Sequence, residues 1–106
     1  MAGRDTYYVR LSLMDPKPGE RERVVKMHED LVTWLPGQPG FVRGYVIVSG
    51  DPLDRVGHMN VWRSMHDADQ AAQTDHVLAI RSALLPLIDK DSHAEHSYET
   101  YAPTGA

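Results

Sequence analysis

The chain contains no cysteine among its 106 residues, which excludes disulfides, thiolate metal sites and thiol catalysis together. It also lacks long hydrophobic runs, and a membrane-spanning helix needs about 20 apolar residues in succession. The first residues, Met1 to Thr6, are polar and have no apolar core of the signal-peptide kind. We therefore expect a cytoplasmic protein with no membrane partner.

A strong charge of one sign is absent as well. Eleven lysines and arginines against 15 aspartates and glutamates give a net charge of -4, which offers no basic surface for nucleic acid. Phenylalanine occurs once, whereas there are five tyrosines and two tryptophans, rings whose polar ends suit partly hydrated pockets. The length and the 42% hydrophobic content fit one domain over residues 1–106, with an ordered core of about 6–102.

Six segments have the patterns of regular structure, in the order strand, helix, strand, strand, helix, strand. The strands are rich in β-branched and aromatic residues, and the helices carry apolar residues at helical spacing. Ser64 is expected to cap the second helical region, with Asp67 reaching back to it, and Thr74 or Asp75 to cap a second piece after a break. The predicted segments are strands at 7–14, 41–49, 55–63 and 93–101, a helix at 20–35, a turn at 50–54, and a helical region that starts at 64 and is closed by 89–91.

This order predicts an α+β fold of the ferredoxin-like βαββαβ kind, a four-stranded antiparallel sheet with two helices on one face. Two helices cover only one face of such a sheet. Both sides of the strands are apolar, however: alternation places Phe41, Tyr45 and Ile47 on one side of the second strand and three valines on the other. Apolar faces need a cover, and a second copy of the chain is the simplest one. We expect a homodimer; the alternative is one exposed apolar face.

The third strand carries the most informative pattern. Val56, His58, Asn60 and Trp62 share one side of it by alternation. Buried polar groups need partners, so this arrangement favours a ligand cavity between sheet and helices. A satisfied structural network and a dimer seam are the alternatives.

Four histidines and two arginines are further candidates. His76 follows the predicted cap, where a helix N-terminus favours a neutral imidazole that can accept a proton; a surface histidine is the alternative. His28 lies within the apolar face of the first helix, as a bonded core residue or a ligand contact. Arg43, and with it Arg10 of the first strand, could hold an anionic ligand or form a solvated cross-strand pair. His93 and His96 spell H-x-x-H, but a strand sends them to opposite faces, so we expect no metal site.

Taken together, these features resemble the antibiotic-biosynthesis monooxygenase superfamily of dimeric α/β barrels. The βαββαβ order extends over about 100 residues. The link Leu35-Pro36-Gly37-Gln38-Pro39-Gly40-Phe41 is similar to that family's link between the first helix and the second strand. A strand ending in Trp62 is followed by a capped helix and by His76 downstream, as in the family.

The resemblance implies a dimer whose two sheets close into a barrel, with a pocket in each chain between sheet and helices. Oxygenase members act on aromatic polyketides or quinols without metal or flavin, and haem-degrading relatives use Asn, Trp and His around the ligand. By position, Trp62 and His76 match the family's Trp and downstream His, whereas Asn60 stands where many members have Glu. A neutral amide cannot act as a base, but it can donate a hydrogen bond to an oxyanion.

The first hypothesis is therefore a cofactor-independent monooxygenase with a small aromatic ligand of the polyketide or quinol type. His76 would accept a proton, Asn60 and Trp62 would stabilise the oxyanion or peroxide, and His58 would position a ring hydroxyl. The remaining predicted substrate-binding residues are His28, Tyr45 and Arg43. The alternatives are haem binding or degradation with His76 as axial ligand, and a non-enzymatic small-molecule-binding or stress-related dimer.

Overall fold

The computed structural model describes residues 6–50 and 54–101; the predicted turn at 50–54 therefore lies mostly outside the described residues, as does the end of the predicted core at 102. Four strands and three helices follow the predicted order. They are β1 (Tyr7–Pro16), α1 (Arg21–Trp34), β2 (Phe41–Val48), β3 (Val56–Trp62), α2 (Met65–Ala72), α3 (Asp75–Leu84) and β4 (Ile88–Thr100), with short 3₁₀ turns η1 (Leu35–Gly37) and η2 (Leu85–Leu87) after α1 and α3.

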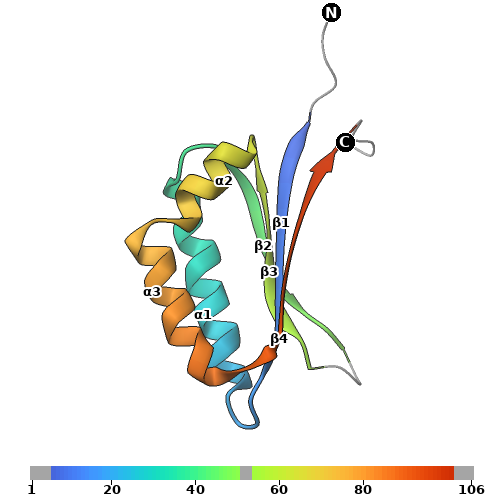
Figure 1. Ribbon diagram of the computed structural model, residues 1–106, viewed down its shortest axis with the longest axis vertical. Coiled ribbons are helices and arrows are strands. Elements are labelled where there is room, and N and C mark those ends of the chain that lie inside the picture. The colour runs from blue at the N-terminus through green and yellow to red at the C-terminus, as the bar shows by residue number, and fades with distance from the viewer. Residues whose placement is uncertain (1–5, 51–53, 102–106) are drawn as a thin grey trace, which may run out of the picture.

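The strands form one antiparallel sheet in the order β2-β3-β1-β4, which confirms the ferredoxin-like α+β fold. All three helices lie on one side of this sheet (Figure 1), and within the described residues no element covers the other side. We call that other side the outer face. Its cross-strand neighbours include Val9 opposite Val61 and Tyr45 opposite Met59. The apolar character predicted for both faces is therefore present in the fold.

The predicted break in the second helical region is confirmed. The Ser64 hydroxyl accepts a hydrogen bond from the Asp67 amide at 3.1 Å, which caps α2, and donates one to the Asp67 carboxylate at 3.0 Å, so Asp67 reaches back to the side chain of Ser64. The Thr74 hydroxyl accepts from the Val77 amide at 3.3 Å and starts α3. Each piece therefore has its own cap, and α2 and α3 take different directions over the sheet (Figure 1).

Two apolar clusters fill the space between sheet and helices. The Trp62 cluster lies around α2 and the end of β3, and the Ile88 cluster lies around the start of β4. Ile80 of α3 packs against both. The buried members are Leu31, Leu35, Trp62, Ala68, Ala71 and Val77 in the first cluster, and Met14, Val24, Val56, Leu84 and Ile88 in the second.

Two predicted strand boundaries are wrong. β4 starts at Ile88 rather than at His93, and β1 continues to Pro16, where it pairs with Ile88 after an irregularity between Leu13 and Asp15. The charged segment 89–91, predicted to close a helical region, therefore belongs to a strand. β4 is an edge strand, and an edge leaves charged side chains in water.

The predicted side of Phe41 is also wrong. The pairing of β2 with β3 shifts between Phe41 and Arg43, a bulge that breaks the simple alternation. Phe41 consequently packs on the helix side, edge-to-face with Trp62 at 5.4 Å between ring centroids, while Tyr45 stays on the outer face.

No helix among the described residues is long and apolar enough to cross a membrane.

Candidate functional site

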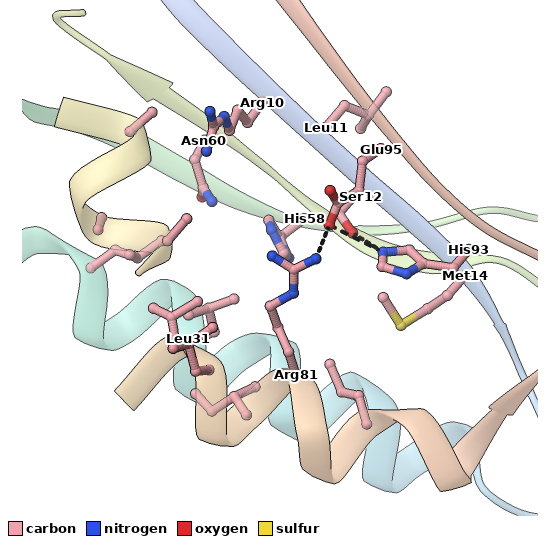
Figure 2. Close-up of a pocket in the computed structure, with 18 of the residues that line it drawn as sticks. Arg10, Leu11, Ser12, Met14, Leu31, His58, Asn60, Arg81, His93 and Glu95 are labelled. Atoms are coloured by element: carbon pink, nitrogen blue, oxygen red, sulfur yellow. Dashed lines mark hydrogen bonds and ion pairs between the residues drawn. The ribbon is translucent and has the colours of Figure 1, made fainter. Parts of the chain in front are cut away.

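A cavity of about 720 Å³ lies between the sheet and the helices. Figure 2 shows polar side chains entering it from the strands, and α1 and α3 closing its other side. His58, Asn60 and Trp62 of β3 all line it, so the polar side of β3 faces the helices. The register places Arg10 and Ser12 of β1 directly beside Asn60 and His58. The helices contribute mainly apolar side chains, so the cavity is apolar on the helix side and polar on the sheet side.

Asn60 is held by packing rather than by hydrogen bonds. Its side chain is only 5% exposed, and its Oδ1 is buried without a partner among the described residues. Gly44 lies opposite it on β2, where an added Cβ would come within 2.7 Å of that oxygen. Trp62, beside it, is 2% exposed and also lines the cavity, and no hydrogen bond joins its indole N–H to the part of the chain that the structure describes. The amide N–H group of Asn60 likewise makes no hydrogen bond within the described residues, so both side chains can donate to a ligand.

Two histidines form a pair behind the cavity wall. His28 of α1 is fully buried, and its Nδ1 lies 2.9 Å from Nδ1 of His58, which faces the cavity. The other ring nitrogen of His28, Nε2, lies 3.3 Å from the sulfur of Met14. Burial lowers the pKa of His28 to about 4, with a smaller effect from His93. Burial, then the neighbouring His28, His93 and Arg81, lower the pKa of His58 to about 3. Both rings are therefore neutral at pH 7.

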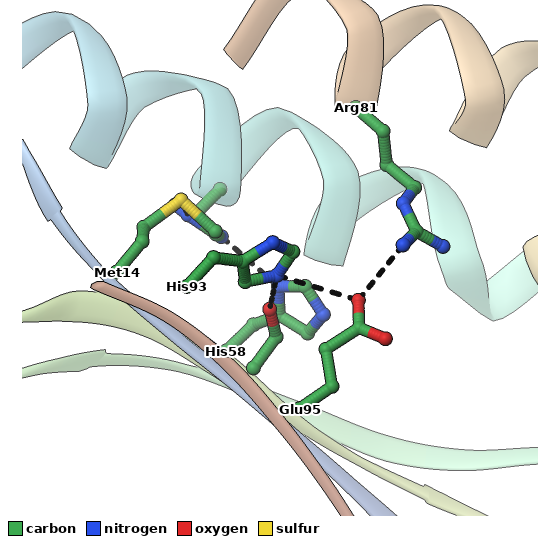
Figure 3. A network of polar contacts seen from close by, with 7 residues as sticks. Met14, His58, Arg81, His93 and Glu95 are labelled. Carbon is green, nitrogen blue, oxygen red and sulfur yellow. Dashed lines mark hydrogen bonds and ion pairs between the residues drawn. The ribbon is translucent and has the colours of Figure 1, made fainter. Parts of the chain in front are cut away.

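A second polar network joins β1, β4 and α3 at the cavity (Figure 3). His93 Nε2 lies 3.2 Å from the Ser12 hydroxyl and 3.4 Å from Oε1 of Glu95. The same carboxylate oxygen accepts a hydrogen bond from Nη2 of Arg81 at 3.0 Å. Ser12 and Glu95 meet the same nitrogen of His93, which differs from a Ser-His-acid triad, in which the two partners use opposite nitrogens. The network therefore orients His93 and does not activate Ser12.

An ion pair connects α2 to the sheet at the other end of the cavity. Nη2 of Arg10 contacts the Asp69 carboxylate, and the Arg10 guanidinium lies 5.3 Å from the centre of the Tyr8 ring. These contacts fix Arg10 beside Asn60. They also leave little free positive charge at that position for an anionic ligand.

His76, the predicted base, lies elsewhere. It is exposed in the first turn of α3 and stacks on Trp34 with ring centroids 4.2 Å apart and planes 16° apart. It does not line the cavity, so the structure does not bring it to Asn60 and Trp62. Its catalytic role stays a prediction.

Three further predicted residues also lie outside the cavity. Arg43 and Tyr45 are exposed on the outer face, where Nη1 of Arg43 lies 3.4 Å from the Tyr45 hydroxyl. His28 supports His58 from behind without lining the cavity itself. Of the predicted substrate-binding set, only His58 faces the cavity.

Sequence reasoning assigned no place in the cavity to several polar residues that line it. Two signals could have found those on the strands: the even side of the first strand, which shares a face with the third strand, and the two-residue spacing of His and Glu in the last strand. His93 and His96 do point to opposite sides, since His93 meets Ser12 while His96 stacks with Tyr98. In the described ranges no three His, Asp or Glu side chains are placed to hold a metal ion. The missed residues include Ser12, Arg81, His93 and Glu95.

These features define a class: a ferredoxin-like α+β domain that carries a half-polar cavity between its sheet and its helices. The model of the antibiotic biosynthesis monooxygenase family matches residues 7–83, and the chain belongs to that family. No curated protein matches the sequence.

Solved structures with low sequence identity share the fold. A candidate antibiotic biosynthesis monooxygenase from Nitrosomonas europaea is 20% identical with a TM-score of 0.83, and the match covers 99% of this chain and 98% of that one. Protein SO0527 from Shewanella oneidensis is 19% identical with a TM-score of 0.82, over 92% and 95% of the two chains. A variant of SnoaB, a cofactor-independent oxygenase from Streptomyces nogalater, is 17% identical with a TM-score of 0.69, over 95% and 96%.

Proposed function

We propose that the protein is a cofactor-independent monooxygenase that oxidises an aromatic polyketide- or quinol-type substrate. The observation that carries this proposal is the position of two side-chain N–H groups, from Asn60 and Trp62, on the polar wall of the cavity, where neither makes a hydrogen bond to the described residues. Such donors stabilise negative charge that develops on a bound aromatic ring or on a peroxide. Family membership and the likeness to an oxygenase fold support the same conclusion.

The reaction needs only substrate, O₂ and a proton acceptor. For an anthrone, the ring CH₂ loses a proton, and the resulting carbanion transfers electrons to O₂ and combines with it to give a hydroperoxide. Loss of water then leaves a carbonyl, so one O₂ yields one C=O oxygen and one molecule of water. The protein has to lower the cost of the anion and exclude bulk water, and an apolar cavity with fixed donors does both.

His93 is the residue that we assign as proton acceptor. It lies in the cavity wall, and Ser12 and Glu95 fix the orientation of its ring. A carboxylate 3.4 Å away stabilises the positive ring that forms when His93 takes a proton. Asn60 and Trp62 would donate to the developing oxyanion, and His58 would hold a ring hydroxyl. The exposed His76 is the competing assignment.

Oxygen uptake by purified, metal-free protein with a panel of anthrones and quinols tests the proposal. We expect one O₂ consumed per substrate, with ¹⁸O from ¹⁸O₂ in the new carbonyl. His93→Gln should slow the reaction by about 10²–10⁴-fold, the range for losing a general base. The matched control, His76→Gln, should leave the rate unchanged.

If His76→Gln slows the reaction and His93→Gln does not, the proton acceptor is His76 and the assignment to His93 is wrong. Absence of acceleration over buffer across the whole panel would overturn the oxygenase proposal. The alternatives give distinct signals: a haem protein would shift the Soret band on titration, and a binding module would hold an aromatic ligand without consuming oxygen.

We also propose that a second copy of the chain covers the outer face, because the family resemblance implies a dimer and this face is apolar over three strands. Met59→Lys would place a charge at its centre and should give a monomer by analytical ultracentrifugation. Met65 lies on α2, away from this face, and is 58% exposed. Met65→Lys is therefore the matched control and should leave the mass of the assembly unchanged. A wild-type protein that is monomeric at micromolar concentration would contradict the proposal.

A further inference from the structure

The contact between His28 and Met14 determines which nitrogen of His28 carries the proton. A thioether sulfur has no hydrogen to donate, so at 3.3 Å the favourable arrangement is an Nε2–H of His28 directed at Sδ of Met14. A neutral imidazole carries one N–H only, and Nδ1 of His28 is therefore the bare, accepting nitrogen. His28 is fully buried, and its lowered pKa keeps the ring neutral.

This assignment passes on to His58. Its Nδ1 lies 2.9 Å from Nδ1 of His28, and since that nitrogen accepts, His58 must donate. The proton of His58 therefore resides on Nδ1, and Nε2 is left bare. That nitrogen makes no hydrogen bond to the residues that the structure describes, and His58 lines the cavity. The cavity is thus offered a hydrogen-bond acceptor on its polar wall, where Figure 2 shows His58 beside Ser12.

We propose that Met14 and His28 are positioning residues that lock His58 as a hydrogen-bond acceptor, so that the cavity selects aromatic ligands that present a hydroxyl to Nε2 of His58. A ligand with a methoxy group or a carbonyl oxygen at that position would place its own acceptor next to the bare Nε2 of His58, and the two could not form a hydrogen bond. This inference deepens the proposed function and rests on its ligand cavity, but it needs no turnover. It also divides the polar wall by role: Asn60 and Trp62 donate, and His58 accepts.

The first experiment is a ¹⁵N NMR spectrum of ligand-free protein labelled in histidine, at pH 7, which distinguishes bare from protonated ring nitrogens. We expect Nδ1–H with a bare Nε2 for His58, and the opposite tautomer, Nε2–H with a bare Nδ1, for His28. Met14→Leu removes the sulfur acceptor at similar volume and should give a mixture of tautomers in both rings. A structural role of Met14 alone would leave the tautomers unchanged. Protonated Nε2 on His58 in the wild type would overturn the inference.

The second experiment is equilibrium binding of a matched pair of probes, a hydroxyanthraquinone and its methyl ether, which differ only in the donor. The hydroxyl form should bind about 10-fold more tightly to the wild type, because the ether leaves an acceptor unpaired. His58→Phe should bring the two affinities within about 2-fold, and His28→Leu should reduce the preference while keeping binding. Equal affinities in the wild type, or binding of neither probe, would overturn the selection for a hydroxyl.

These measurements separate two kinds of failure. The tautomers are read without any ligand and the affinities without any reaction. If the probes discriminate as expected but no oxygen is consumed, the inference stands and the oxygenase proposal fails. If oxygen is consumed and both probes bind alike, the opposite holds.

Discussion

Replacing Asn60 by leucine should make the protein more stable while abolishing its proposed activity. The Asn60 Oδ1 is buried without a partner among the described residues, and an unsatisfied buried polar group costs about 1–3 kcal/mol. Leucine branches at the same atom, so it can fill nearly the same space next to Gly44 and Val32. Allowing for imperfect fit, we expect the free energy of unfolding to rise by about 1 kcal/mol, or about 4–8 °C in Tm for a domain near this size.

Urea and thermal denaturation followed by circular dichroism measure this effect. A leucine variant less stable than the wild type, with an unchanged slope in urea, would refute the reasoning: it would mean that Oδ1 is satisfied in solution. A double-mutant cycle with Gly44→Ala adds a geometric control. The new Cβ would lie 2.7 Å from Oδ1 of Asn60 and 3.1 Å from Val32, so Gly44→Ala should cost less in an Asn60→Ala background.

Acidification and glycine replacement give two further predictions. The pKa values of His28 and His58 are about 4 and about 3 in the folded protein, against about 6.5 when unfolded, so the unfolded state binds more protons in acid. The free energy of unfolding should be highest above pH 6.5 and should fall as the pH drops toward 4, by up to about 1.4 kcal/mol per pH unit for each histidine. Urea midpoints that do not change between pH 7 and 5 would contradict this prediction. Gly40→Ala should destabilise more than Gly19→Ala in thermal melts, since both glycines have positive φ, at +79° and +83°, but only the Cβ at 40 would meet another side chain, that of Asp67 at 2.1–2.6 Å. Equal losses for the two variants would mean that the Asp67 side chain moves aside without cost.

The parts of the site that depend on local pattern could be predicted from the sequence. Strand alternation correctly grouped His58, Asn60 and Trp62, because the period of two holds within an unbroken strand. The same rule failed for Phe41, because a bulge that no local signal marks reverses its side. The role of His76 as a base is predicted from its position next to the Thr74 cap, and the structure confirms that cap. The distance of His76 from the cavity depends on the direction of α3 over the sheet, and periodicity does not encode that direction.

The chemistry of the cavity was harder to foresee because it is shared between distant segments. Ser12 and His93 meet only through the pairing of the first and last strands, 81 positions apart. The charged start of β4 is predicted from the sequence to close the preceding helical region, and this hides the length of the strand and its alignment with β1. Arg81 is a helix residue of ordinary appearance until Glu95 is placed opposite it.

The division of the apolar interior into the Trp62 cluster and the Ile88 cluster makes stability itself a detector of ligands. The cavity is lined by members of both clusters, so an aromatic molecule bound there would touch the two together and bury apolar surface that belongs to each. Binding to the folded state alone raises the unfolding free energy by RT ln(1 + [L]/Kd), about 2.7 kcal/mol at a ligand concentration 100 times Kd. A melting-temperature survey of hydroxylated aromatics would therefore find the substrate class of this protein in the absence of oxygen and with no knowledge of the product.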